Sequence, residues 1–384
     1  MRVLFVTFIE PSKYSGGGLV SYQSLLELTN SAEVDYLGPE FDVEKFSDLK
    51  IKKLYFYGRD ESLLRRAMFS LAGLPSLYYY SYKSNEKSID VNSYDLVYCE
   101  DSRSDFVIKW AKKSNVPTFV RVQNIEQDYL YKRMKNDKSI REKISAFLKY
   151  ISIQRRENYC FKYTNKAIFL TLNDKERGIE LYSKADLLDK SFILPVCIAP
   201  RLCNEIPSSN LKKGYILLTG SFWYGVNANG AVWFIDNVWK QLSNLTDVNL
   251  VIAGARPNDD IRNRTNKDER IILIDTPEDM SPYFNDAKVY AAPIFDGAGM
   301  KVKVAEALSW GLPVVATSHA LIGYDSVKDV CVLANDSEQF VKGIMSILNS
   351  EYSKNSIKDV FTTFYSTDSS TKIMRNLLSE IEKD

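Results

Sequence analysis

The chain has 384 residues, of which 45% are hydrophobic and 26% are charged. This composition is typical of a globular protein and excludes a disordered or fibrous chain, and the length is sufficient for two domains. Fifty basic and forty-nine acidic residues give a net charge of +1, which excludes a chain-wide field that attracts nucleic acid. Any basic binding surface must therefore be local.

Short β-branched segments alternate with longer amphipathic segments along the whole chain, which indicates α/β architecture with parallel sheets between helices. In the first half, the predicted strands are 2–7, 95–99, 117–122, 167–170 and 192–194. In the second half, the predicted strands are 215–219, 249–253, 271–274, 289–292 and 313–316, and the predicted helices are 228–242, 277–287 and 301–310.

The segment 198–213, IAPRLCNEIPSSNLKK, is rich in proline, serine and asparagine and predicts a linker. We therefore expect an N-terminal domain at 1–197 and a C-terminal domain at 214–365. The remaining residues, 366–384, predict a helix. Its pattern leaves open which domain it packs on, and the N-terminal domain is one option.

The residue types restrict the chemistry. A single histidine, His319, excludes a Ser-His-Asp triad, a histidine-rich zinc site and an HExxH protease. For this histidine an exposed loop position is favoured over a role in a site. Five cysteines without CxxC spacing predict reduced thiols and a cytosolic protein. The first residues, MRVLFVTFIE, predict a strand and no signal peptide, and no apolar run reaches the roughly 18 residues of a membrane span.

Residues 129–166 combine tyrosine and phenylalanine with eleven lysines and arginines against three acidic residues. A solvated helix face is the favoured interpretation. An anionic membrane surface is the second, because basic amphipathic helices with aromatic residues lie at bilayer interfaces, and nucleic acid is a distant third. Segment 54–83 has a similar mixture.

A first glycine motif, Ser15-Gly16-Gly17-Gly18, lies between the first predicted strand and a helix starting near Leu19. Glycines allow the backbone to approach a ligand, and a helix N-terminus offers N–H groups to an anion. The motif is neither a GxGxxG fingerprint nor a P-loop. A flexible loop is therefore favoured over a ligand site at Gly17 and Gly18.

A second and more specific motif spans residues 291–317, AAPIFDGAGMKVKVAEALSWGLPVVAT. It predicts a strand, a glycine loop, a helix and another strand. The loop amides at Gly297 and Gly299 can bind sugar hydroxyls or a diphosphate, and Lys301 and Lys303 supply positive charge in the first helical turn. One turn later Glu306 can accept hydrogen bonds from a ribose diol, the alternative being a surface pair with Lys303.

This block resembles the donor-binding signature of GT-B glycosyltransferases, in particular the retaining family 4 group. Segments 218–234, 251–254 and 274–280 are similar to that family's diphosphate and nucleobase regions, and 121–129, RVQNIEQDY, is similar to its cleft wall. The resemblance implies two doubly wound Rossmann-like domains that face each other across a cleft.

The resemblance also implies the roles of individual residues. The implied catalytic residues are Lys303, Lys301, Gln123 and Glu126. The implied donor-binding residues are Gly17, Gly18, Gly220, Ser221, Arg256, Thr276, Pro277, Asp296, Gly297, Ala298, Gly299, Met300 and Glu306. The implied acceptor-side residues are Asn124 and Arg121.

The chain departs from the family pattern at three places. Gln123 replaces a histidine, and Ala298 replaces the first of two glutamates, so that the sugar contact falls to backbone amides, to Asp296 or to no group. The basic pair that often follows the Gly-Ser dipeptide is also missing. The phosphate charge then falls to Lys301 and Lys303, with Arg256 or Arg121 as further candidates.

The resemblance implies a hexosyltransferase-type enzyme that moves a sugar, with retention, from a nucleotide-sugar donor to a lipid-linked or protein-linked glycan of a cell-surface polysaccharide. The departing phosphate takes the acceptor proton, so no histidine is needed. We expect no metal, no other cofactor and no nucleic-acid partner. We expect a cytoplasmic protein, and attachment to the inner membrane face through 129–166 stays open. The alternatives are a non-catalytic GT-B module that binds sugar or stabilises a partner and, less favoured, a nucleotide-sugar epimerase.

Overall fold

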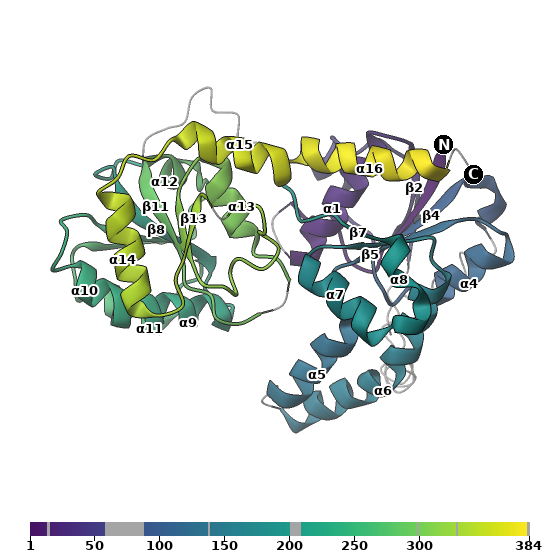
Figure 1. Cartoon of the computed structure of the whole chain (residues 1–384), viewed down its shortest axis with the longest axis horizontal. Helices are drawn as coiled ribbons and strands as arrows, with labels where there is room; N and C mark the ends of the chain where they lie inside the picture. Colours follow the sequence, from purple (N-terminus) through teal and green to yellow (C-terminus); the bar gives the residue numbers. More distant parts are fainter. Residues whose placement is uncertain are drawn as a thin grey trace. The chain divides into compact units, whose positions relative to one another are not determined.

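The computed structural model describes residues 1–13, 16–57, 88–136, 139–199, 209–297, 299–327 and 329–381. They form two compact units, of which unit 1 is Met1–Val196 with Ser370–Asp384 and unit 2 is Cys197–Ser369. Each unit contains its own parallel sheet (Figure 1). The predictions made for Ser15, Ala298, Cys203 and residues 58–83 lie outside the described residues.

The described part of unit 1 contains a seven-stranded sheet in the order β3-β2-β1-β4-β5-β6-β7. Its strands are β1 (Arg2–Val6), β2 (Glu33–Gly38), β3 (Ile51–Phe56), β4 (Leu96–Cys99), β5 (Thr118–Val122), β6 (Lys166–Phe169) and β7 (Ser191–Ile193). Its helices are α1 (Gly16–Thr29), α4 (Asp105–Lys113), α5 (Glu126–Asn136), α6 (Ile140–Tyr163), α7 (Leu172–Leu181), α8 (Leu187–Lys190) and, from Ser370 onward, α16 (Thr367–Ile381). The strand order reverses between β1 and β4, and ligands bind at the carboxyl ends of the strands at such a point.

The described part of unit 2 contains a six-stranded sheet in the order β10-β9-β8-β11-β12-β13. Its strands are β8 (Tyr215–Ser221), β9 (Leu250–Ala255), β10 (Ile271–Asp275), β11 (Ala287–Ala292), β12 (Val314–Ala316) and β13 (Cys331–Leu333). Its helices are α9 (Gly225–Phe234), α10 (Lys240–Leu242), α11 (Asp259–Thr265), α12 (Ser281–Asp286), α13 (Val302–Ser309), α14 (Ser337–Leu348) and α15 (Lys354–Phe364). Strand order again reverses, between β8 and β11.

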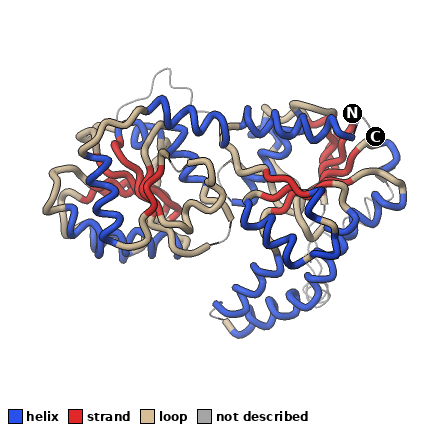
Figure 2. The backbone as a smooth tube through the Cα atoms, in the orientation of Figure 1, coloured by secondary structure: helices blue, strands red, loops and turns tan. Residues whose placement is uncertain are grey.

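Helices cover both faces of each sheet (Figure 2). In β1, Leu4 and Val6 belong to one hydrophobic cluster, and Val3 and Phe5 belong to another on the opposite face. Buried strands of parallel sheets are apolar on both faces for this reason. The last helix, α16, contributes Met374, Leu377 and Leu378 to the second cluster, so the chain end packs on unit 1. No helix in the described ranges combines the length and the apolarity needed to cross a bilayer.

The structure confirms each predicted strand to within two residues and adds β2, β3 and β13. The predicted helix 277–287 is wrong in length, because α12 begins only at Ser281. Pro282 lies in its first turn, where a missing N–H costs nothing. The predicted helix 228–242 begins earlier, at Gly225, and contains a π-helical turn at Ile235–Trp239.

A buried ion pair joins α1 to β5 in unit 1. Arg121 is completely buried, with Nη1 3.4 Å from Oε2 of Glu27, and its Nη2 donates to the carbonyl oxygens of Leu194 and Pro195 at 3.2 Å. Burial raises the pKa of Glu27, and the Arg121 charge opposes that rise. The prediction that Arg121 faces an acceptor or a phosphate is wrong, because its charge is used inside the unit.

Replacing Arg121 should destabilise unit 1. We expect Arg121→Met to lower the free energy of unfolding by about 3–5 kcal/mol, because it leaves the buried Glu27 without its cation. The Glu27→Met/Arg121→Met double variant should recover much of this loss, since an apolar pair of similar volume replaces both charges. Urea unfolding followed by circular dichroism measures both effects.

The control is Arg177→Met, which removes solvent-exposed ion pairs with Asp128 and Glu180 and should cost less than about 1 kcal/mol. Equal losses in Arg121→Met and Arg177→Met would contradict the assignment of Arg121.

Candidate functional site

A glycine loop follows β11 at the carboxyl edge of the unit 2 sheet. Gly297 and Gly299 have φ angles of +99° and +69°, which glycine adopts readily and other residues rarely do. Lys301 Nζ donates to the carbonyl oxygens of Gly297 at 3.0 Å and Gly299 at 2.7 Å. His319 Nε2 lies 2.6 Å from the same Gly297 oxygen, so Nε2 must carry a proton. Both side chains therefore hold the loop in its shape.

These contacts change two predictions. In this structure the Lys301 ammonium group points into the loop and hydrogen-bonds to backbone carbonyl oxygens, so it does not point into an open site. His319 is half-buried and hydrogen-bonded, so the favoured expectation of an exposed bystander is wrong. No sequence motif predicts this contact, because it depends on a turn 22 residues earlier in the chain.

Lys303 connects three elements at the same edge. From the first turn of α13, its Nζ donates to the carbonyl oxygen of Thr219 at 3.0 Å and to Oδ1 of Asn227 at 2.8 Å. A Cβ atom on Gly220 would lie 3.3 Å from this Nζ, so glycine leaves room around the ammonium group. Burial lowers the pKa of Lys303 to about 8, and Glu306 opposes the shift. The structure thus brings the predicted residues Gly220, Lys303 and Glu306 together.

Two residues at the ends of β9 and β10 have unusual backbone conformations. Arg256 and Thr276 have φ angles of +53° and +50°, which is exceptional for a β-branched residue such as Thr276. The Thr276 N–H donates to the Gly254 carbonyl at 2.8 Å, and the Arg256 N–H donates to Thr276 Oγ1 at 3.2 Å. Backbone strain of this kind concentrates at functional sites. Pro277 follows directly and is half-buried.

The other predicted donor residues lie along the same edge. Ser221 ends β8 and is exposed, and Met300, which follows Gly299 directly, is buried. Asp296 is exposed, and its Oδ1 accepts the Gly297 N–H at 2.7 Å. That contact uses one of the two carboxylate oxygens and rigidifies the loop.

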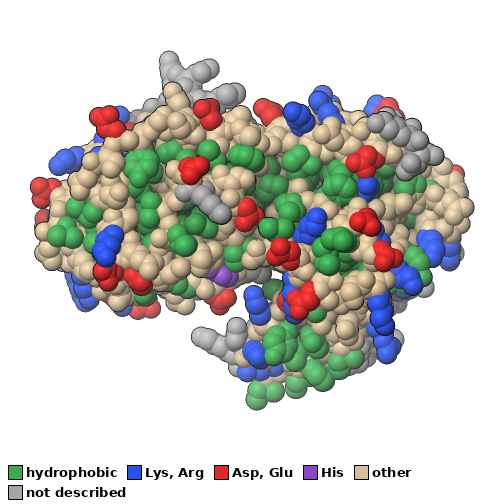
Figure 3. Space-filling model, viewed as in Figure 1, with side chains coloured by type: hydrophobic (Ala, Val, Ile, Leu, Met, Phe, Trp, Pro, Cys, Tyr) green, Lys and Arg blue, Asp and Glu red, His purple; other side chains and the backbone are tan. Residues whose placement is uncertain are grey.

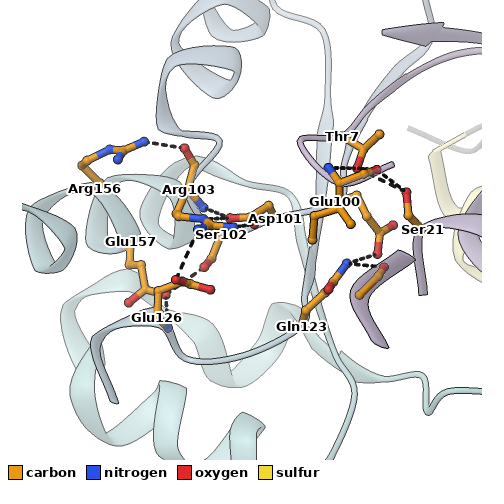
Figure 4. Close-up of polar contacts among 12 residues, drawn as sticks. Thr7, Ser21, Glu100, Asp101, Ser102, Arg103, Gln123, Glu126, Arg156 and Glu157 are labelled. Atoms are coloured by element: carbon orange, nitrogen blue, oxygen red, sulfur yellow. Dashed lines mark hydrogen bonds and ion pairs between the residues drawn. The ribbon is translucent and has the colours of Figure 1, made fainter. Parts of the chain in front are cut away.

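In unit 1, Gln123 lies directly after β5 beside the first turn of α1 (Figure 4). Its Nε2 donates to the carbonyl oxygen of Gly17 and to Oε1 of Glu100, both at 3.3 Å. A Cβ atom on Gly17 would lie 2.5 Å from Gln123 Oε1, and one on Gly18 would lie 2.8 Å from the Glu10 carbonyl oxygen. Close contacts with Gln123 and Glu10 thus require glycine at these two positions of α1, and the favoured interpretation of Gly17 and Gly18 as part of a flexible loop is wrong.

Glu100 is a site residue that the sequence analysis missed. It follows β4 at the point where the strand order reverses, is completely buried, and lies behind Gln123. Within the described part of the chain, its Oε2 has no hydrogen-bond partner. Burial raises its pKa to about 7, although Arg121 opposes the shift. A single glutamate after a strand belongs to no motif, so the sequence offered no signal for it.

Glu126 begins α5 in a neighbouring polar cluster (Figure 4). Burial raises its pKa to about 7, and Arg103, whose Nη1 lies 3.5 Å from Oε2, opposes the shift. Glu157 accepts the backbone N–H groups of Glu126 at 3.0 Å and Gln127 at 3.1 Å, which caps the helix. Glu126 is thereby held in place, and Asn124 is half-buried two residues before it.

A cavity of about 870 Å³ opens beside Gly17 and Gly18 in unit 1. It is lined by apolar, acidic and basic groups, including Ile9, Glu10, Lys13, Asp42, Lys45 and Phe46. This mixture suits a polar organic ligand that carries hydroxyl groups. Among the residues that the structure describes, no group of three or more His, Cys, Asp or Glu side chains is arranged to hold a metal ion.

Residues 213–350 match the family model of the glycosyl transferases, group 1. Unit 2 carries a group 1 glycosyltransferase domain. The matched range includes the glycine loop, both lysines and Glu306, so the motif that predicted this family lies within this glycosyltransferase domain.

Solved structures resemble the whole chain. A glycosyltransferase from Rickettsia africae is 14% identical, with a TM-score of 0.65 and coverage of 100% of this chain and 99% of that chain. Anabaena Alr3699/HepE, solved in complex with UDP, is 11% identical, with a TM-score of 0.66 and coverage of 99% and 100%. These likenesses concern the fold and confirm the predicted GT-B class.

A relative from Klebsiella pneumoniae, an uncharacterized 44.6 kDa protein in the cps region, is 25% identical over 374 residues. The match covers 92% of this chain and 91% of that protein. The similarity therefore extends through both units, beyond the glycosyltransferase domain.

Glu100 should make the stability of unit 1 depend on pH. Its folded-state pKa is raised to about 7, so its contribution is fully present below the unfolded pKa and is lost as pH rises through 7. We expect Glu100→Gln to reduce the fall in unfolding free energy between pH 5 and pH 8 by up to about 3 kcal/mol. Urea unfolding at the two pH values measures this difference.

Glu180→Gln is the matched control, since this carboxylate is exposed and pairs with Arg177 at the surface. An unchanged pH dependence in Glu100→Gln would show that Glu100 ionises normally.

Proposed function

We propose that this protein is a retaining glycosyltransferase that transfers a hexose from a nucleotide-sugar donor to a glycan acceptor. The observation that carries the proposal is the Lys303 ammonium group, which is held between Thr219 and Asn227 at the edge of a group 1 glycosyltransferase domain. Such an ammonium group can pair with a diphosphate. The complexes of Alr3699/HepE with UDP and UDP-glucose support a nucleotide sugar as the donor.

In this mechanism, the protein stabilises the charge that develops on the departing diphosphate. Lys303 exchanges its neutral oxygen partners for phosphate oxygens, and the loop amides near Gly297 and Gly299 add N–H donors. Donors that are already oriented toward a developing charge often supply the largest part of catalysis. Arg256 and Thr276 frame the nucleoside, and Glu306 accepts hydrogen bonds from its ribose.

The acceptor is assigned to unit 1. Gln123 and Asn124 orient acceptor hydroxyl groups, and Glu126 contributes a carboxyl group whose pKa of about 7 allows it to accept or donate a proton near neutral pH. The bond from the anomeric carbon to the diphosphate breaks while the acceptor oxygen forms the new bond on the same face. The departing phosphate oxygen takes the acceptor proton, so the reaction needs no histidine.

The names of similar proteins support a role in cell-surface polysaccharide synthesis. The Klebsiella relative is named for its cps region, and WaaG, which is 14% identical with a TM-score of 0.58, is titled as a glycosyltransferase of lipopolysaccharide biosynthesis. We therefore propose a lipid-linked or protein-linked glycan as the acceptor. We also propose a cytoplasmic location, which suits the buried free thiols of Cys99, Cys160 and Cys197.

A nucleoside diphosphate should stabilise the protein. At 100 times its Kd, the preferred diphosphate should add about 2.7 kcal/mol to the unfolding free energy, and a thermal-shift screen of UDP, GDP, ADP, CDP and TDP measures this stabilisation.

The affinity for the diphosphate should fall about tenfold for each pH unit above pH 8, because Lys303 in the free protein, with a pKa of about 8, then has to take up a proton on binding. Lys303→Met should abolish the shift, and the exposed Lys240→Met should retain it. A melting temperature of the wild type that stays unchanged with all five diphosphates would overturn the proposal.

Catalysis should depend more on Lys303 than on Gln123. We expect Lys303→Ala to lower the initial rate of sugar transfer by about 10²–10³-fold, and Gln123→Ala to lower it less, because an amide carries no charge to the diphosphate. Nucleotide release from the donor measures both rates. Equal losses would contradict the charge assignment.

The same assay tests the rival function, a non-catalytic GT-B module, which is favoured by Gln123 and Ala298 at positions where the family has a histidine and a glutamate. A wild-type protein that binds the diphosphate but releases no nucleotide from any donor, even slowly without acceptor, would be such a module.

A further inference from the structure

Helices α5 and α6 form a hairpin that projects from unit 1 (Figure 1). One face of α6 packs on α5, where Leu130, Ala146 and Ile153 are buried together with the partly buried Met134 and Tyr150. The final turns of α6 place Cys160 and Phe161 in the main core. The hairpin is therefore anchored at its base and packed internally, so its outer face is not needed for either contact.

The outer face of α6 is apolar and exposed. Ile140, Ile144, Phe147 and Ile151 are 77%, 54%, 48% and 57% exposed. Their spacing of four, three and four residues places them on one side of the helix, where they form a stripe roughly 16 Å long. Isolated exposed hydrophobic residues are ordinary, but a continuous apolar stripe marks an interaction surface.

Basic residues are concentrated in the same hairpin. Between Tyr129 and Arg155 the sequence has eight lysines and arginines and two acidic residues. Lys132, Lys135, Arg141 and Arg155 are exposed, and Tyr129 and Tyr131 are 37% and 43% exposed. Figure 3 shows hydrophobic side chains together with lysines and arginines on this projecting part.

We propose that the α5–α6 hairpin binds an anionic lipid bilayer. Ile140, Ile144, Phe147 and Ile151 enter the boundary between headgroups and acyl chains, and the lysines and arginines of the hairpin contact lipid phosphates, as in amphipathic helices that lie in the membrane plane. The inference is independent of the proposed function, because membrane binding requires neither donor nor acceptor.

The combination of charge and apolarity separates this occupant from the others. A second copy of the hairpin would bring like charges together, which is unfavourable. A nucleic acid would neutralise the basic residues but would leave three isoleucines and a phenylalanine in water, so that their apolar surface would remain unburied. An anionic bilayer both neutralises the basic residues and buries the apolar side chains.

The test is cosedimentation of the full chain with vesicles of phosphatidylglycerol and phosphatidylcholine, compared with vesicles of phosphatidylcholine alone. We expect binding that depends on phosphatidylglycerol. The Ile144→Ser/Phe147→Ser double variant should bind at least tenfold more weakly at both 0.1 M and 0.5 M salt, because its loss is hydrophobic. The matched control is Leu188→Ser/Leu245→Ser, which removes two leucines that are 69% and 55% exposed elsewhere and should bind like wild type.

The charged residues give a second signature. Arg141→Gln and Arg155→Gln should each weaken binding about fivefold at 0.1 M salt, and this effect should fade at 0.5 M salt because screening shortens the range of the attraction. Wild-type protein that stays in the supernatant with phosphatidylglycerol vesicles would overturn the proposal. So would unchanged binding by the Ile144→Ser/Phe147→Ser variant, or a dimer of the wild type that this variant abolishes without any vesicle binding.

Discussion

A cation lies near the carboxyl edge of each sheet, and the two cations differ in the groups that compensate their charge. Arg121 pairs with the carboxylate of Glu27 and with two backbone carbonyls, so its charge is neutralised inside unit 1. Lys303 hydrogen-bonds to the neutral oxygens of Thr219 and Asn227. A cation held in this way keeps positive potential for an anionic ligand, and the proposed chemistry depends on it.

Two carboxyl groups of unit 1 have pKa values that differ strongly from those of exposed carboxyl groups. Glu100 and Glu126 are both buried, and burial raises the pKa of each to about 7. The charges of Arg121 and Arg103 oppose the rise for Glu100 and Glu126 respectively, without cancelling it. Carboxyl groups whose pKa is shifted toward neutrality by burial are typical of functional sites. Both carboxyl groups can therefore exist in protonated and ionised forms near neutral pH.

The long helix α6 serves two different surroundings. Its last turns belong to the core through Cys160 and Phe161, and Glu157 caps α5 in the same region. Its first turns expose Ile140 and Ile144. One end of this helix lies in the core and the other end is exposed, so its apolar residues do not follow a single face along its whole length. For this reason the sequence favours an ordinary solvated helix face, and the exposed apolar stripe becomes apparent only from the burial of each residue.

The sequence alone determined the parallel α/β architecture, the positions of most strands other than β2, β3 and β13, and the glycine loop with its two lysines, because periodicity and turn residues act over a few neighbouring positions. It did not determine the burial of Arg121, the position of Glu100 behind Gln123 or the contact of His319 with Gly297. Each of these joins side chains to segments 22 to 94 residues away. Packing decides such contacts, since the energy of a charge or a hydrogen bond depends on what the folded chain places around it.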